Sequence, residues 1–523
     1  MSRFLLGAFL CLIAAVPAFG APQVTIDLGA LQGTADGGIT AFKGIPFAAP
    51  PTGPLRWRAP QPASSWAGVR DASQFGPICP QSKLSLLATM KPHLKLPQSE
   101  DCLTLNVWSP DVRPGAKLPV MVWIYGGAFR NGSSAAPLYD GTELANHRVL
   151  VVSFNYRLGW LGNFDLATLA SEHPGEPSGN YGLLDQIAAL VWVKRNIAAF
   201  GGDPDNVTIF GESAGGVSVN DLMVSPLAHG LFAKAIAESG LGLTDMATTS
   251  QAQAAAAAFA QRENAGQGGM ADLEKLRALS VDDIIDDEAA MDVTVTSPMV
   301  DGTVIPEQVA KLFAAGKVAH VPYIAGSNSN EATLMPLLRM TSETMLAQLG
   351  DQLPLVRKAY EQDGLLTNDA FGRQVFGDVL FASGAQGLAS FVAKTGSLAF
   401  VYQFAYVADA QRSISDGVGH GGELPYVFGI AGFSSQPGMA LAARLATPKD
   451  LTIVSMMQNY WTNFAKTGNP NGQGVPQWTP TSPVKPTTLV VSDETKNVEG
   501  FRKAQLSIVY AGWSKRTGVA APN

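Results

Sequence analysis

A run of β-forming residues that ends in a serine flanked by glycines is the strongest constraint in this sequence. Residues 206–216 read NVTIFGESAGG, so Gly211, Ser213 and Gly215 form a G-x-S-x-G pattern. In a sharp turn from strand to helix, the serine is strained, and side chains two residues away would clash with it. The pattern also occurs in ordinary glycine-rich turns, but its place after a strand indicates that Ser213 is a nucleophile. We expect a helix over 214–224 whose N-terminus faces a developing oxyanion.

Short apolar segments around this turn predict a sheet that is buried on both faces. Continuous apolar runs at 120–125, 149–154 and 206–210 are typical of buried strands. Apolar residues recur at helical spacing over 183–200, and glycine ends that helix. We expect further strands at 321–326, 398–406 and 488–491, with mostly helical stretches at 245–315 and 336–396. These elements predict one α/β domain over 21–523, with a large, mostly parallel central sheet flanked by helices and with helical insertions.

The first 20 residues, MSRFLLGAFLCLIAAVPAFG, have the pattern of an export signal. Arg3 gives a positive start, residues 4–16 are apolar, and residues 18–20 fit a small-x-small cleavage site. The apolar stretch is shorter than the about 20 residues that a membrane-spanning helix needs. We predict that 1–20 is a signal peptide of a periplasmic or secreted protein without a membrane anchor. A buried helix at the start of the fold is the alternative.

Export also bears on the cysteines. Cys11 lies in the signal, so the mature chain keeps Cys79 and Cys102. Two cysteines in an exported protein are expected to form a disulfide, with two free thiols as the alternative. Neither a CxxC motif nor clustered histidines accompany them, so a metal site is not indicated.

A nucleophilic serine needs a base, and few histidines follow Ser213. On the scaffold that this pattern indicates, the acid and then the base follow the serine, which leaves His229, His320 and His420. His229 is too close to Ser213 for an intervening strand and acid, and His320 precedes the strand expected at 321–326. His420 lies in a loop with glycines on both sides, which give its backbone the freedom to approach the serine. We predict that His420 is the general base.

The acid that orients this base is expected just after a strand. Glu331 is the first carboxylate after the strand expected at 321–326. Asp301 is the main alternative, but the glycine that follows it indicates a turn. We predict that Glu331 is the acid.

Residues 123–129, WIYGGAF, are a strand that runs into small residues. Such a loop brings backbone N–H groups close to a substrate carbonyl, where they stabilise a developing oxyanion. Gly127, Ala128 and, from the serine turn, Ala214 are the candidate donors. A glycine turn without a catalytic role is the alternative.

The chain resembles the type B carboxylesterase/lipase family, which includes cholinesterases and bacterial p-nitrobenzyl esterases. The matching stretches are FKGIPF (42–47), LRW (55–57), EDCLTLN (100–106), WIYGGAF (123–129), FNYRLGWLG (154–162), GNYGLLDQ (179–186), FGGDPDNVTIFGESAGG (200–216) and HGGELPYVFG (420–429). Together they are specific and extend over most of the mature chain.

This resemblance implies an α/β-hydrolase fold with a Ser213–Glu331–His420 triad. It also implies an oxyanion hole at Gly127, Ala128 and Ala214, and a Cys79–Cys102 bridge. By the same resemblance, Glu212 and Ser239 support the triad from nearby, with a turn residue and a strand-end hydroxyl as the alternatives.

One departure concerns the substrate. Cholinesterases place a tryptophan within the first disulfide loop, where a cation lies on its face. Residues 79–102 contain no tryptophan and carry Lys83, Lys91, His93 and Lys95 instead, so a quaternary ammonium ester is not expected. These residues favour either an anionic ester or, more simply, a solvated loop.

These patterns predict a serine hydrolase that cleaves small or bulky-alcohol esters through an acyl-enzyme, without a metal or organic cofactor. The alternatives are a lipase for long-chain esters, an amidase or thioesterase with the same site, and a non-catalytic binding domain of the same fold. With a net charge of −7 and no Lys/Arg cluster, nucleic acid is not an expected partner. No feature indicates the oligomeric state.

Overall fold

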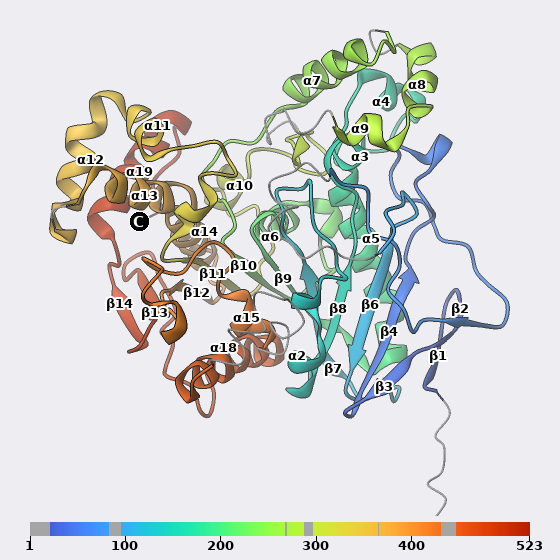
Figure 1. Cartoon of the computed structure of the whole chain (residues 1–523), viewed down its shortest axis with the longest axis horizontal. Helices are drawn as coiled ribbons and strands as arrows, with labels where there is room; N and C mark the ends of the chain where they lie inside the picture. The colour runs from blue at the N-terminus through green and yellow to red at the C-terminus, as the bar shows by residue number, and fades with distance from the viewer. Residues whose placement is uncertain are drawn as a thin grey trace, which may run out of the picture.

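The computed structural model describes residues 21–82, 96–266, 269–286, 296–364, 366–429 and 446–522. An 11-stranded sheet runs through the molecule, and helices flank it (Figure 1). The strand order is β14-β13-β12-β11-β10-β9-β7-β8-β6-β4-β3. The strands are β3 (Thr34–Asp36), β4 (Ile39–Pro46), β6 (Thr104–Ser109), β7 (Leu118–Ile124), β8 (Leu150–Phe154), β9 (Gly202–Glu212), β10 (Lys234–Glu238), β11 (Tyr323–Asn328), β12 (Ala399–Phe404), β13 (Thr487–Val491) and β14 (Lys496–Glu499). The predicted signal peptide, residues 1–20, lies outside the described residues.

The centre of this sheet is parallel and its margins are antiparallel. From β8 through β7, β9, β10, β11 and β12 to β13, each strand pairs with its neighbour in parallel. The strands β6, β4 and β3 at one margin and β14 at the other pair antiparallel. Parallel strands need helices on both faces, which explains their continuous apolar runs. The mostly parallel α/β architecture is therefore confirmed.

Every strand predicted from a continuous apolar run is present, with ends that differ by a few residues. One central strand, β10, was not predicted, because its sequence KAIAE begins and ends with a charged residue. Both charged residues are nevertheless buried: Lys234 is 6% exposed and Glu238 is 0% exposed. The strand's position in the sheet overrides the polarity of its ends.

Helices pack on the sheet close to the serine turn. α6 (Ala214–Val224) contacts β9 and β10, α14 (Ser383–Lys394) contacts β11 and β12, and α18 (Pro448–Thr467) contacts β7 and β9. The helix predicted over 183–200 is α5 (Tyr181–Asn196), followed by a 3₁₀ turn at Ile197–Phe200. Gly201 then ends it with a positive φ of 87°, a conformation that glycine adopts without strain.

Two groups of helices are inserted between the strands, as the helical patterns predicted. The first group is α7 (Thr249–Arg262), α8 (Met270–Arg277) and α9 (Val281–Asp286). The second is α11 (Ser342–Ala347), α12 (Leu353–Tyr360) and α13 (Asn368–Gly377), beside the C-terminal helix α19 (Lys503–Thr517) at the other end of the molecule (Figure 1). The second group encloses an apolar core of its own, separate from the core that surrounds the sheet.

Candidate active site

The predicted nucleophile Ser213 lies between the end of β9 and the start of α6. Its φ of 57° and ψ of −122° are a strained conformation for a residue with a side chain. A Cβ on Gly215 would lie 1.9 Å from the backbone oxygen of Ile124, and one on Gly211 would lie 2.6 Å from the backbone of Gly215. The glycines of the G-x-S-x-G pattern are therefore required by backbone contacts with β7 and within the turn itself.

The predicted acid Glu331 begins a 3₁₀ turn directly after β11, and its side chain is 1% exposed. Its Oε1 accepts hydrogen bonds from the backbone N–H of Asn328 at 2.7 Å and from Oγ of Ser239 at 2.6 Å. Its Oε2 lies 2.6 Å from Nδ1 of His420. These donors satisfy a buried carboxylate and fix its orientation toward the imidazole.

The rejected acid behaves as a turn residue. Oδ1 of Asp301 accepts hydrogen bonds from the backbone N–H groups of Thr303, Val304 and Ile305. Its Oδ2 accepts a further bond from Asn180. The three backbone contacts stabilise the local turn, as the following glycine indicated, and the bond from Asn180 connects this turn to a distant segment.

The loop that carries His420 is tied to the loop that carries Glu331. The backbone N–H of His420 donates to Oγ1 of Thr333 at 2.9 Å, and Asn330 donates its backbone N–H to the oxygen of Val418 at 2.8 Å. The positive φ of Gly417 and Gly421 allows this close approach. Glu331 and His420, distant in sequence, are thereby held as a hydrogen-bonded pair.

Nε2 of His420 faces a second carboxylate. It lies 3.2 Å from Oε1 of Glu212, the residue that precedes Ser213. Within the described part of the chain, this nitrogen makes no hydrogen bond, so it is not bonded to the Ser213 hydroxyl. In free enzymes such catalytic bonds are often long and tighten only when substrate binds. The structure thus brings the acid and base together and places the serine turn beside them.

The electrostatics of this site are dominated by carboxyl groups around one imidazole. Burial disfavours protonation of His420, but the charges of Glu212, Glu331 and Glu423 outweigh that effect and raise its pKa to about 9. The imidazolium form is therefore strongly stabilised.

Two buried carboxyl groups near the site, Glu423 and Glu238, were not predicted as site residues. Both are 0% exposed. Trp461 donates its Nε1–H to Glu238 at 2.9 Å, and Asn328 donates its side-chain amide to Glu423. Burial, followed by repulsion from Glu212 and Glu331, raises the pKa of Glu423 to about 8. Burial and repulsion from Glu423 also raise the pKa of Glu238 well above its ordinary value.

A sequence signal for these two residues exists. Glu238 directly precedes Ser239, and Glu423 lies three residues after His420. What the sequence does not reveal is that both side chains point inward, where two ionised carboxylates repel each other.

The predicted oxyanion donors lie where the loop after β7 meets the serine turn. Gly127, Ala128 and Phe129 have positive φ values of 126°, 54° and 56°. A Cβ on the preceding glycine, Gly126, would lie 2.9 Å from Cβ of Ser213, so the two segments touch. Within the described residues, the N–H groups of Gly127, Ala128 and Ala214 have no hydrogen-bond acceptor. These donors suit an oxyanion formed at the serine.

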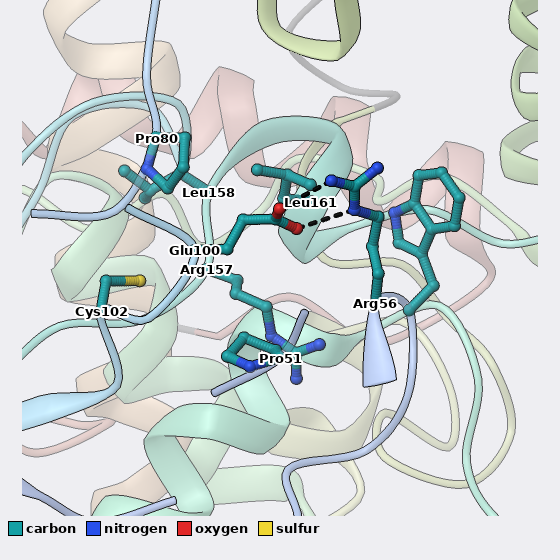
Figure 2. Close-up of a pocket in the computed structure, with 9 residues that line it drawn as sticks. Pro51, Arg56, Pro80, Glu100, Cys102, Arg157, Leu158 and Leu161 are labelled. Atoms are coloured by element: carbon teal, nitrogen blue, oxygen red, sulfur yellow. Dashed lines mark hydrogen bonds and ion pairs between the residues drawn. The ribbon is translucent and has the colours of Figure 1, made fainter. Parts of the chain in front are cut away.

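The structure contains the predicted disulfide between Cys79 and Cys102, and both residues are buried. The basic residues Lys83, Lys91, His93 and Lys95 lie outside the described residues. A cavity of about 10 Å³ beside Cys102 is lined by residues that include Arg56 and Glu100. The guanidinium of Arg56 donates two hydrogen bonds to the carboxylate of Glu100, from Nε at 2.7 Å and from Nη2 at 2.6 Å (Figure 2). A space of this size holds about one water molecule, so it is not a substrate site.

Comparisons with known proteins place this geometry in context. The model of the carboxylesterase family matches residues 20–509. Para-nitrobenzyl esterase of Bacillus subtilis (strain 168) is 39% identical over 473 residues, which are 86% of this chain and 91% of that protein. Fumonisin B1 esterase of Sphingopyxis macrogoltabida is 36% identical over 457 residues, which are 86% of this chain and 83% of that protein.

Solved structures are similar over the same extent. A structure of PNB esterase has a TM-score of 0.80 at 34% identity and covers 93% of this chain and 99% of its own. The Geobacillus stearothermophilus carboxylesterase EST55 has a TM-score of 0.79 at 31% identity and covers 92% of this chain and 99% of its own.

Proposed function

Because the chain belongs to the carboxylesterase family and is a carboxylic-ester hydrolase, we propose that it works through an acyl-enzyme formed on Ser213. The observation that carries this proposal is the 2.6 Å contact between Glu331 and Nδ1 of His420, beside a strained serine turn. A buried acid hydrogen-bonded to a base, with a serine beside that base, are the parts that acyl transfer needs. The chain therefore offers each role from its own side chains.

In the first half-reaction, the imidazole turns from Glu212 toward Ser213 and accepts the hydroxyl proton. The serine oxygen attacks the ester carbonyl, and the N–H groups of Gly127, Ala128 and Ala214 hold the oxyanion of the tetrahedral intermediate. Collapse of this intermediate breaks the bond to the alcohol, which leaves with the proton from His420. The acyl group then remains on Ser213.

The second half-reaction repeats these steps with water. His420 takes a proton from the water, the hydroxide oxygen attacks the acyl carbonyl, and Ser213 leaves with the proton. Throughout, Glu331 holds the imidazole in the tautomer whose Nε2 accepts a proton. The products are a carboxylic acid and an alcohol.

The proposed substrate is a small-molecule ester with a short acyl chain or a bulky alcohol. The names of two relatives, para-nitrobenzyl esterase and fumonisin B1 esterase, support bulky-alcohol esters as the class to examine first. Rates on p-nitrophenyl acetate, butyrate, octanoate and palmitate test this preference. A steep fall with chain length fits the proposal, whereas a maximum at palmitate would instead indicate a lipase.

The nucleophile is tested by replacing Ser213 with alanine. We expect turnover to fall by about 10³-fold or more while the folded structure is kept, since the substitution only removes one hydroxyl. Ser65→Ala, at an exposed position outside the site, serves as a serine-to-alanine control. Substantial activity in Ser213→Ala would contradict the assignment.

Export is part of the same proposal. The signal-like residues 1–20 and the Cys79–Cys102 disulfide both fit an oxidising compartment outside the cytoplasm. Expression with the native N-terminus and intact-mass analysis of the product test it. A mature protein that begins at Ala21 supports export, and retention of residues 1–20 in a cytoplasmic fraction contradicts it.

A further inference from the structure

A π-helical turn interrupts a long helix close to His420. The helix runs from 368 to 394 and consists of α13, the π-helical turn Asp378–Ala382, and α14. By length and composition it resembles a membrane span, but 83% of its most apolar window is buried inside the fold, as in a core helix. A π-helical turn inside an α-helix is uncommon and recurs at functional sites.

Phe381, within this turn, packs against the imidazole of His420. The two ring centroids are 5.3 Å apart with an interplanar angle of 54°, and Phe381 is 2% exposed. Among the ring pairs of the described residues, it is the one aromatic partner of His420. The loop around His420 is rich in glycine and provides little side-chain packing of its own. Phe381 therefore packs on the face of an imidazole whose two nitrogens lie against Glu331 and Glu212 and to which its own loop adds little packing.

The same ring belongs to the core of the second helical insertion. This core also contains Ala332, which directly follows Glu331, and Met335, four residues after Glu331. A Cβ on Gly377, just before the π-helical turn, would lie 3.9 Å from Cβ of Glu331. One apolar cluster thus supports both the acid and the base.

A buried polar contact, here called the Asp378 clasp, fixes the start of the π-helical turn. Asp378 is 4% exposed and accepts hydrogen bonds from Nε of Arg502 at 2.7 and 2.8 Å. The Tyr360 hydroxyl donates to the same carboxylate at 2.6 Å, and the guanidinium lies 5.2 Å from the centre of the Tyr360 ring. The clasp connects α12, the π-helical turn and the residue before α19.

We propose that Phe381 is a positioning residue for His420. We also propose that the Asp378 clasp holds Phe381 in place through Arg502, the residue before the C-terminal helix α19. This inference rests on the proposed function, because it assigns the imidazole the role of base. Phe381 carries no charge, and leucine at this position would keep the imidazole buried, so we expect the substitution to change the direction of the imidazole more than its pKa. Small displacements of a base lower the rate of proton transfer without weakening substrate binding.

The substitution Phe381→Leu tests the first half of the proposal. We expect kcat for p-nitrophenyl butyrate to fall about tenfold with KM unchanged, because a displaced base slows chemistry more than binding. We also expect the midpoint of the acidic limb of the pH–rate profile to stay in place. The matched control is Phe391→Leu, on the same helix and also 2% exposed, whose ring packs on Trp513 instead. It loses thermal stability but keeps kcat.

The clasp is tested by a double-mutant cycle between Asp378→Asn and Phe381→Leu. If the clasp acts through Phe381, Asp378→Asn lowers kcat in the wild-type background and has no further effect in the Phe381→Leu background. If the two substitutions lower kcat independently, so that the double variant shows the product of their effects, the clasp does not act through Phe381. An unchanged kcat in Phe381→Leu would overturn the proposal itself. Tyr360→Phe, which removes one hydrogen bond only, replaces Asp378→Asn in the cycle if that variant does not fold. Absence of any wild-type hydrolysis would instead contradict the proposed function.

Discussion

Nε2 of His420 lies 3.2 Å from Oε1 of Glu212, while Nδ1 of the same ring lies 2.6 Å from Oε2 of Glu331. The imidazole is therefore held between two carboxylates, one on each side of the ring. In the proposed mechanism, this arrangement stabilises the imidazolium that forms when His420 takes the serine proton. It also means that, in the free protein, the proposed base is engaged with Glu212 and must turn to reach Ser213.

Replacing Glu212 with glutamine is expected to change the pH dependence of kcat/KM. If His420 is the base, as proposed, it accepts a proton only when neutral, so kcat/KM rises with pH through its pKa, which the carboxylates raise to about 9. Removal of one negative charge lowers this pKa and moves the midpoint to lower pH, by about one to three pH units. Rates on p-nitrophenyl butyrate between about pH 6 and pH 10 measure it. An exposed carboxylate, in Glu361→Gln, serves as the control, and an unmoved midpoint in Glu212→Gln would contradict the contact.

Loss of the Ser239 hydroxyl is expected to slow catalysis moderately. Ser239 donates to Oε1 of Glu331 at 2.6 Å, and the backbone N–H of Asn328 remains as a second donor after substitution. A hydrogen bond to a charged group contributes about 1.5–3 kcal/mol, so Ser239→Ala is expected to lower kcat by about 10- to 150-fold. Steady-state kinetics beside Ser213→Ala distinguish this support from the nucleophile itself. A loss as large as that of Ser213→Ala would show that Ser239 has a direct catalytic role.

A methyl group at Gly215 is expected to disrupt the serine turn. The added carbon would lie 1.9 Å from the oxygen of Ile124, a distance that requires β7 and the turn to separate. We expect Gly215→Ala to lose activity and to unfold at lower temperature. The control is Gly512→Ala in α19, where nothing lies within 4 Å of the added carbon. That change is expected to stabilise the helix by about 0.5–1 kcal/mol, and equal effects at both positions would contradict this account.

The disulfide is expected to contribute measurably to stability. Cys79 and Cys102 are 23 residues apart, and closing a loop of this length stabilises by about 3 kcal/mol in the chain-entropy model. Urea denaturation of a variant with both cysteines replaced by serine measures the loss in free energy of unfolding. An unchanged free energy would indicate that the bridge restrains the loop locally and not the fold.

The sequence predicted the fold where strands are uniformly apolar. Such runs mark β7, β8 and β11, because parallel strands are buried on both faces. The central strand β10 was missed because Lys234 and Glu238 interrupt its pattern, and only the completed sheet shows that both are buried. Charged residues at the ends of a segment therefore do not show whether it is a buried strand unless its neighbouring strands are known.

The candidate site was predicted where chemistry restricts the residue types. Ser213 and His420 follow from glycine patterns and chain order, and the structure brings His420 against Glu331. Glu423 and Phe381 were missed for a different reason. Whether a carboxylate points inward, or where a helix widens into a π-helical turn, depends on packing between segments that are distant in the sequence.

The central claim is that Ser213 is the nucleophile of a serine esterase, and covalent labelling tests it most directly. The mature chain is assayed on p-nitrophenyl butyrate before and after treatment with an organophosphate that phosphorylates active serines. The treated protein is then digested, and the masses of its peptides are measured by mass spectrometry. The account predicts that hydrolysis is lost and that the added mass lies on the peptide with Ser213, absent in Ser213→Ala. Hydrolysis that persists after treatment, or an adduct on another serine, would contradict it.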